Sequence, residues 1–247
     1  MGLRSRMLHQ TDSTDGWASG RKGDACSRMK ARVAELQLMF AELDAEIIRG
    51  ARATGLTCRP MCGQCCEFPG IHLSLADAMP LAFELCRDHR GEDMLAALRA
   101  QSAADESRGG CPMYRPLTTD SKTTSAGTAP HGAADASGQA YRRGRCTAYG
   151  ARPGLCRLFG FARSSDSPAV LLACQMLKED FRDNLVLQRA GHDSLSAAPQ
   201  MDAWQRRIAA VFPDLDARPQ PIRTTIRQAL ELVLHAQGYA SSGVAST

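Results

Sequence analysis

Cysteines are the residues of this sequence whose number and spacing could support chemistry. The chain has ten of them, and eight form two groups, the first within nine residues and the second spread further along the chain. Thiolates are soft, anionic ligands that suit zinc and iron, and a structural zinc site takes four ligands in tetrahedral geometry. Eight thiolates could therefore fill two four-thiolate sites or one larger cluster. The eight candidate metal ligands are Cys58, Cys62, Cys65, Cys66, Cys111, Cys146, Cys156 and Cys174.

The first group is expected to form only part of a metal centre. If residues 58–66 were helical, Cys58, Cys62 and Cys65 would share one face. Cys66 would then lie about 100° around the helix, where it could serve a second metal or bridge two. Because the second group begins 45 residues after Cys66, the middle of the chain is expected to fold back on the first group.

Basic residues accompany the cysteines. Positive charges beside thiols lower their pKa and stabilise an anionic centre. Arg152 and Arg157 flank a turn signal, Pro153-Gly154, that can direct Cys156 toward Cys146. We therefore expect these two to be more than solvated surface residues. The arginines that lie beside cysteines in the sequence are Arg59, Arg142, Arg143, Arg145, Arg152, Arg157 and Arg163.

Composition narrows the classes of partner and compartment. Residues 1–21 contain no apolar run of signal-peptide length, so we expect an intracellular, cytoplasmic protein in which clustered thiols bind metal rather than form disulfides. No run of 18 apolar residues exists, so no membrane span is expected. The formal net charge of +4 is modest and spread along the chain, so we do not expect nucleic acid as a partner.

Helical periodicity dominates the segments that must position these cysteines. Apolar residues recur at steps of three and four, which favours a mainly α fold in which helices pack around cysteine-rich loops with short extended pieces. One extended piece is expected at Ile71–Leu73, and hairpin-like alternation follows at 141–149. The helices are expected at 27–49, 74–87, 92–107, 175–189, 201–212 and 222–237.

A single domain at 26–238, with a core at 56–178, is predicted between two disordered tails at 1–25 and 239–247. Residues 118–140 are polar and of low complexity, which predicts an inserted surface loop. The remaining cysteines are assigned outside the metal centre. Cys86 lies on the apolar face of a predicted helix and is expected in the core, whereas Cys26 is expected as a free thiol in a polar tail.

The order of the motifs resembles the YkgJ-type cysteine-cluster family, a zinc- or iron-chelating domain. Its pattern is a C-x2-3-C-x2-C-C segment, then Cys-Pro, a basic Gly-x-Cys segment, Arg-Pro-x-x-Cys and a last cysteine. Here these are 58–66, Cys111-Pro112, Gly144-Arg-Cys146, Arg152-Pro-Gly-Leu-Cys156 and Cys174. The resemblance covers about residues 56–178. The polar insertion departs from the family pattern, in which Cys111 and Cys146 are usually close in sequence.

The resemblance implies a metal or iron-sulfur centre held by up to eight cysteines, with no established reaction. Flagellin lysine N-methylases carry similar cysteine patterns and an iron-sulfur cluster, so an iron-sulfur-dependent redox or methyl-transfer enzyme is the alternative. The spacing C-x3-C-x2-C is also that of radical S-adenosylmethionine enzymes, but those are built on βα repeats. His72 is expected as a structural residue rather than a ligand, and no local pattern supports Cys-His catalysis.

Overall fold

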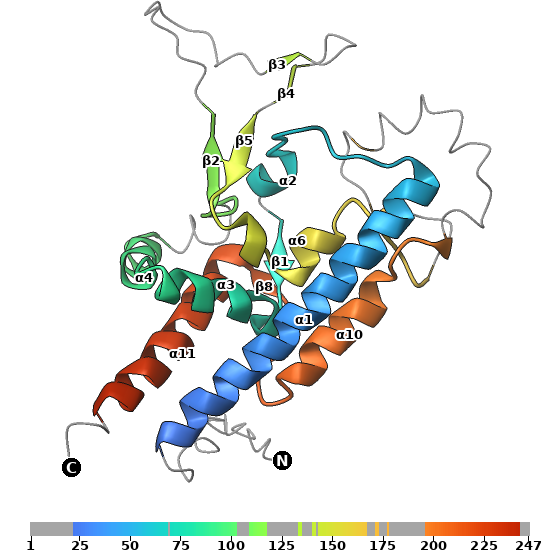
Figure 1. Ribbon diagram of the computed structural model, residues 1–247. Helices are drawn as coiled ribbons and strands as arrows, with labels where there is room; N and C mark the ends of the chain where they lie inside the picture. The colour runs from blue at the N-terminus through green and yellow to red at the C-terminus, as the bar shows by residue number, and fades with distance from the viewer. Residues whose placement is uncertain are drawn as a thin grey trace, which may run out of the picture.

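A long helix, α1 (Lys22–Thr54), runs across the molecule (Figure 1). Four helices pack against it, namely α3 (Leu75–Arg87), α6 (Gly154–Leu158), α10 (Met201–Val211) and α11 (Ile222–Ser242). Helices account for most of the described residues, so the fold is mainly α, as predicted. The computed structural model describes residues 22–68, 70–102, 109–117, 133–134, 140–141, 143–166, 171–172, 177 and 196–242.

One face of α1 is a buried stripe of apolar side chains. A helix places residues at steps of three and four on one face, and such a face gains stability by packing on the core. The predicted helix at 27–49 is confirmed and extends beyond both predicted ends. Gly55, with φ of 71°, follows the helix in the left-handed conformation. The stripe consists of Met29, Val33, Leu36, Phe40 and Leu43.

Cys26 corrects the prediction for the N-terminal segment. Its predicted location in a polar tail is wrong, because Cys26 lies on α1 and is only 5% exposed, whereas the predicted free thiol is confirmed. It precedes Met29 by one helical step and therefore continues the buried stripe. Because α1 begins at Lys22 and α11 ends at Ser242, each helix runs four residues into a segment predicted as a disordered tail.

Helices α3 (Leu75–Arg87) and α11 (Ile222–Ser242) pack together at the centre of the core. Ser74 caps α3, since its Oγ accepts the Asp77 N–H at 3.3 Å, and the helix continues through Pro80. The face of α11 that packs inward is apolar and fully buried. It consists of Ile222, Ile226, Ala229, Leu230 and Val233.

Two further helices complete what we call the helical frame, namely α1, α3, α4, α10 and α11. The prediction for α10 (Met201–Val211) is confirmed, whereas α4 (Gly91–Arg99) is shorter than the predicted 92–107. Leu95 and Leu98 are the last large apolar side chains of that stretch, so no buried face continues the helix. Residues 103–108, and all but one residue of the helix expected at 175–189, lie outside the described residues.

Strands occur as short antiparallel pairs, and one pair stands out from the helices in Figure 1. In that pair β2 precedes and β5 follows the polar insertion predicted at 118–140, of which only 133–134 and residue 140 are described. None of the described helices is long and apolar enough to cross a membrane. The pairs are β1 (His72–Leu73) with β8 (Gln220–Pro221), β2 (Tyr114–Pro116) with β5 (Gly144–Cys146), β3 (Ala133–Ala134) with β4 (Ala140–Tyr141), and β6 (Ala162–Arg163) with β7 (Leu171–Leu172).

Candidate metal centre

The first cysteine segment is a bent loop that ends in one helical turn. Met61 has φ of 58°, a left-handed conformation that interrupts any helix through residues 58–66. The hypothesis of a helix with three cysteines on one face is therefore wrong. Only α2 (Gln64–Glu67) is helical, and Gly63 O accepts the N–H groups of Cys66 at 2.9 Å and Glu67 at 3.1 Å.

A direct backbone contact joins the first two cysteine segments. The Cys111 N–H donates to Cys66 O at 2.7 Å. Gly110 makes this approach possible, because a Cβ at that position would lie only 2.6 Å from the same Cys66 oxygen. The first and second segments, 45 residues apart in the sequence, are thus held in register by a hydrogen bond and a glycine.

The β2–β5 pair brings in the next cysteine. Tyr114 lies opposite Cys146 in the antiparallel register, so the strands before and after the polar insertion pair with each other. Cys62 forms an isolated bridge with Arg143, and Gly144 N–H donates to Met61 O at 2.8 Å. The ladder therefore places the first segment alongside β5, and the insertion does not separate Cys111 from Cys146 in space.

Two glycines make room for the Tyr114 ring beneath this ladder. A Cβ built at either Gly63 or Gly144 would lie 2.1 Å from the ring. Any larger residue would have to displace the tyrosine, since real Cβ contacts are never that short. The ring therefore fixes the separation between the first cysteine segment and β5.

Cys156 reaches the site on a short helix held by a buried carboxylate. Helix α6 (Gly154–Leu158) begins where Asp77 Oδ1 accepts the Leu155 N–H at 3.3 Å. Ser74 Oγ donates to Asp77 Oδ2 at 2.9 Å, and burial raises the pKa of Asp77. A Cβ at Gly154 would lie 2.9 Å from Asp77 Oδ1, so glycine permits the close approach of the two helices.

The adjacent thiols Cys65 and Cys66 have opposite pKa shifts. The hydrogen bond from the Cys66 thiol lowers the pKa of Cys65 to about 7, with help from the positive charge of Arg152 and against burial and the Cys62 charge. The same hydrogen bond, in which Cys66 is the donor, and burial raise the pKa of Cys66. Of the pair, Cys65 is thus the thiol that ionises first.

Electrostatic interactions link thiols from all three segments. Burial, with the charges of Cys146 and Cys65, raises the pKa of Cys111 to about 11. Burial, with the charges of Cys111 and Cys65, raises the pKa of Cys156 well above its ordinary value. Thiols that shift one another's pKa must lie close together. We call these six the cysteine cluster: Cys62, Cys65, Cys66, Cys111, Cys146 and Cys156.

The cluster is a group of thiols without the geometry of a complete coordination sphere. Within the described residues no three His, Cys, Asp or Glu side chains are arranged to hold a metal ion. Cys58, in the same loop as Cys62, is exposed. Cys174 lies outside the described residues. Mutual effects on pKa thus connect six of the eight predicted ligands, and metal binding by them stays a prediction.

The two arginines singled out in the sequence have different roles. Arg152 lowers the pKa of Cys65, its guanidinium lies 3.8 Å from the centroid of the Tyr149 ring, and its Nε is buried without a hydrogen-bond partner. Arg157 is buried and instead holds α6 to the frame. It donates to Arg152 O at 2.9 Å and forms an ion pair with Asp44 of α1. Arg152 is thus a positive charge beside Cys65.

Residues assigned elsewhere from the sequence do lie outside the cluster. His72 is exposed, with Nδ1 3.0 Å from Gly70 O. Cys86 packs against the core, and burial, with a smaller effect of Glu92, raises its pKa to about 11. Sequence reasoning missed the second role of Asp77. Its place three residues after Ser74 signals a cap of its own helix, and nothing local indicates that it also holds α6.

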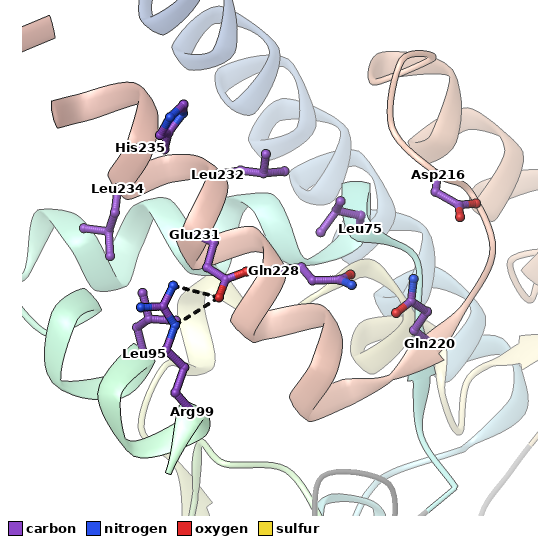
Figure 2. Close-up of a pocket in the computed structure, with 10 residues that line it drawn as sticks. All are labelled: Leu75, Leu95, Arg99, Asp216, Gln220, Gln228, Glu231, Leu232, Leu234 and His235. Atoms are coloured by element: carbon purple, nitrogen blue, oxygen red, sulfur yellow. Dashed lines mark hydrogen bonds and ion pairs between the residues drawn. The ribbon is translucent and has the colours of Figure 1, made fainter. Parts of the chain in front are cut away.

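A separate open hollow of about 800 Å³ lies beside α3, α4 and α11 (Figure 2). Arg99 and Glu231, which pair at 2.9 Å, both line it. Leucines such as Leu75 and Leu95 are also among its lining residues, and no cysteine is. The cysteine cluster is therefore the better candidate for a functional site, because it alone gathers ligands of one chemical kind.

Comparisons with known proteins add no assignment. No protein-family model matches the chain, and no match is found among curated proteins or solved structures.

Proposed function

We propose that this protein is a zinc- or iron-chelating cysteine-cluster protein. The six thiols of the cysteine cluster, together with Cys58 and Cys174, would supply the ligands of a metal or iron-sulfur centre. The observation that carries the proposal is the convergence of thiols from three segments, with 45 residues between Cys66 and Cys111 and 35 between Cys111 and Cys146. No packing requirement explains such a gathering, since apolar side chains would fill the same space without the cost of buried thiolates.

The chemistry of the donors fits a soft metal. Thiolates bind zinc and iron as deprotonated ligands, so metal binding would expel the protons that burial and neighbouring charges hold on Cys66, Cys111 and Cys156. Several thiolates around a divalent ion leave net negative charge, which Arg152 is positioned to offset. Once bound, the metal would cross-link the three segments.

Membership of the YkgJ-type family is part of the same proposal and is supported by the ordered cysteine motifs. We also place the protein in a reducing compartment such as the cytoplasm, because thiols must stay reduced to bind metal. The centre is proposed as non-catalytic, and an iron-sulfur-dependent redox or methyl-transfer enzyme is the alternative.

Metal analysis after anaerobic purification tests the proposal. We expect a stoichiometric metal, either colourless zinc or iron with the visible absorption of an iron-sulfur cluster. Cys66→Ser, Cys111→Ser and Cys156→Ser should each lower the metal content. Cys26→Ser and Cys86→Ser are matched controls that should not, because both cysteines lie outside the cluster.

The outcomes separate the proposal from its alternatives. A purified protein without metal, or one that keeps full metal content in all three cluster variants, would show that the cluster is not a metal centre. An iron-sulfur chromophore agrees with the proposal, and it would make the redox and methyl-transfer reactions that similar cysteine patterns accompany the next activities to assay.

A further inference from the structure

Helix α1 has a second row of apolar side chains on the face that points away from the core. Its residues recur at alternating steps of three and four, which is the spacing of the a and d positions of a coiled coil. All six residues are exposed, and none of the described helices lies in front of α1 in Figure 1. We call this row the outer stripe: Ala31, Ala34, Leu38, Ala41, Ala45 and Ile48.

Packing within the described part of the chain does not explain the outer stripe. The opposite face of α1 already carries the buried stripe that packs on the other helices. Leu38 is 71% exposed, more than any other large apolar side chain among the described residues, and Ile48 is 50% exposed. A surface helix that packs on one side carries charged and polar residues on the opposite face. A row of exposed apolar side chains there instead marks a contact surface.

We propose that the outer stripe binds the outer stripe of a second copy of this chain, with the two α1 helices antiparallel. A two-fold contact of this kind requires a surface that is complementary to itself. The order of large and small residues meets that requirement, because each large side chain lies opposite an alanine when the stripe is reversed. The pairs, each formed twice, are Leu38 with Ala41, Ala34 with Ala45, and Ala31 with Ile48.

Other alignments of the two helices fit less well. A parallel pair in register would place Leu38 against Leu38 and Ile48 against Ile48, which would hold the helices apart where alanine faces alanine. An antiparallel pair shifted by seven residues in one direction would place Leu38 against Ile48 and bring the exposed Arg52 into the seam. A shift in the other direction would leave Ile48 with no residue of the stripe opposite it.

The charged border of the stripe agrees with the same alignment. Glu42 lies next to Ala41 at an e position, and Arg207 of α10 pairs with it at 2.8 Å. In the antiparallel pair, Glu35 of the second copy lies within two residues of Glu42, about 3 Å along the axis. Arg207 therefore provides a positive charge for carboxylates of both copies, and this edge favours a second copy over an acidic or a neutral helix.

An antiparallel pair keeps the two cysteine clusters separate. The first cysteine segment follows the C-terminal end of α1, and the C-terminal ends of antiparallel helices point in opposite directions. Each copy would therefore hold its own metal centre, and metal content per chain should not change on dimerisation. The proposal does not depend on the metal.

Sedimentation equilibrium of the full chain from about 1 to about 200 μM tests the proposal, in a non-thiol reductant that prevents intermolecular disulfides. We expect a dimer with a dissociation constant on the order of 10 μM, since one pair of helices is a small interface. Ala41→Glu places a charge at the centre of the seam and should weaken dimerisation about tenfold or more. Ala97→Glu, the same change at an exposed alanine of α4, is the matched control and should dimerise like wild type.

An exchange of sizes tests the pairing of the two residues at the centre of the stripe. Leu38→Ala leaves alanine opposite alanine, and Ala41→Leu places leucine opposite leucine, so each should weaken dimerisation about fivefold. The double variant Leu38→Ala, Ala41→Leu again places leucine opposite alanine and should dimerise within about twofold of wild type. Weakening in the double variant equal to the sum of the two single effects would contradict the pairing.

Two further results would overturn the proposal. A wild-type chain that stays monomeric at about 200 μM has no such interface, and a dimer that Ala41→Glu leaves unchanged uses another face. If the monomeric chain loses stability in Ala41→Glu but not in Ala97→Glu, the outer stripe packs on a segment of its own chain. Unfolding is followed well below the dissociation constant, where Leu38 of the monomer is exposed. Metal content of the same samples distinguishes failure of the dimer from failure of the metal centre.

Discussion

The helical frame and the cysteine loops, residues 58–67, 110–117 and 143–158, are held together by different interactions. Of the twelve largest fully buried side chains, only Met113 and Leu158 come from the loops. The frame therefore gains most of its stability from apolar burial, which is non-directional and grows with buried area. The loops depend on specific backbone hydrogen bonds and on glycines that allow close approach.

This difference indicates what each region needs in order to be ordered. The frame buries whole apolar faces and can fold without a ligand. In the loops, short strand pairs and a one-turn helix bury little apolar surface, and such elements are marginal alone. A metal bound by thiols from all three loop segments would supply the missing stabilisation. The frame is thus expected to respond to packing changes and the loops to metal.

Leu230→Ala should give the largest loss of stability and leave the metal centre intact. Leu230 is fully buried on α11, so the cavity should lower the free energy of unfolding by about 2–5 kcal/mol. Urea unfolding measures the loss, and metal per folded chain should be unchanged. Leu38→Ala, at a residue 71% exposed on α1, controls for side-chain removal and should change the free energy by less than about 0.5 kcal/mol. A parallel fall in metal content would mean that the two regions are one unit.

Gly144→Ala should lower metal content more than the stability of the helical frame, the reverse of Leu230→Ala. The new Cβ would meet the Tyr114 ring at 2.1 Å, and overpacking of this kind costs about 1–3 kcal/mol. Because the ring spaces the first cysteine segment from β5, metal content should fall more than global stability.

The chain offers a matched glycine and a rescue for this variant. A Cβ at Gly150 has no neighbour within 4 Å, so Gly150→Ala should retain metal. Adding Tyr114→Ala to Gly144→Ala should restore part of the metal content by removing the clash. Equal metal content in the two alanine variants would show that the tyrosine does not set the loop spacing.

The frame could be predicted from the sequence because its signals are local. Apolar residues at helical steps identified α1, α3, α10 and α11, and Ser74 marked where α3 begins. For these helices the predictions erred in where a helix begins or ends, because the apolar pattern is weak there. Cys26 continued a stripe that began in a polar segment, and α4 ended where its large apolar residues ran out.

The geometry of the loops could not be predicted in the same way. The cysteine spacing pointed to convergence, but a strand of three residues such as β2 carries no periodicity that identifies its partner across the insertion. The left-handed Met61 has no local signal either, since that conformation is uncommon for residues other than glycine. The long-range contact between Asp77 and α6 depends on tertiary packing, so it became visible only in the structure.

Arg157 is the ion-pair link between the two regions and should show intermediate effects. It is buried in α6, and its Asp44 partner on α1 is 41% exposed at the side chain, so the pair is worth less than a fully buried one. Arg157→Gln should destabilise by about 1–2 kcal/mol, because polar groups such as Gly150 O lose their donor. A double-mutant cycle with Asp44→Asn measures the coupling. Additive effects would show that the contact does not connect frame and loops.

Asp77→Asn should have the smallest effect on the free energy of unfolding, and that effect should depend on pH. Burial raises the pKa of Asp77 in the folded state, so the protonated carboxyl is favoured there. Its contribution to stability is complete below the ordinary carboxyl pKa of about 3.9 and is lost as pH rises through the raised value. Asparagine does not titrate, so the stability of wild type relative to the variant should fall as pH rises through that window. Urea unfolding at a series of pH values checks this, with the exposed Asp93→Asn on α4 as a control for lost charge. Parallel pH profiles for wild type and Asp77→Asn would mean that the cap of α6 does not change its protonation on folding.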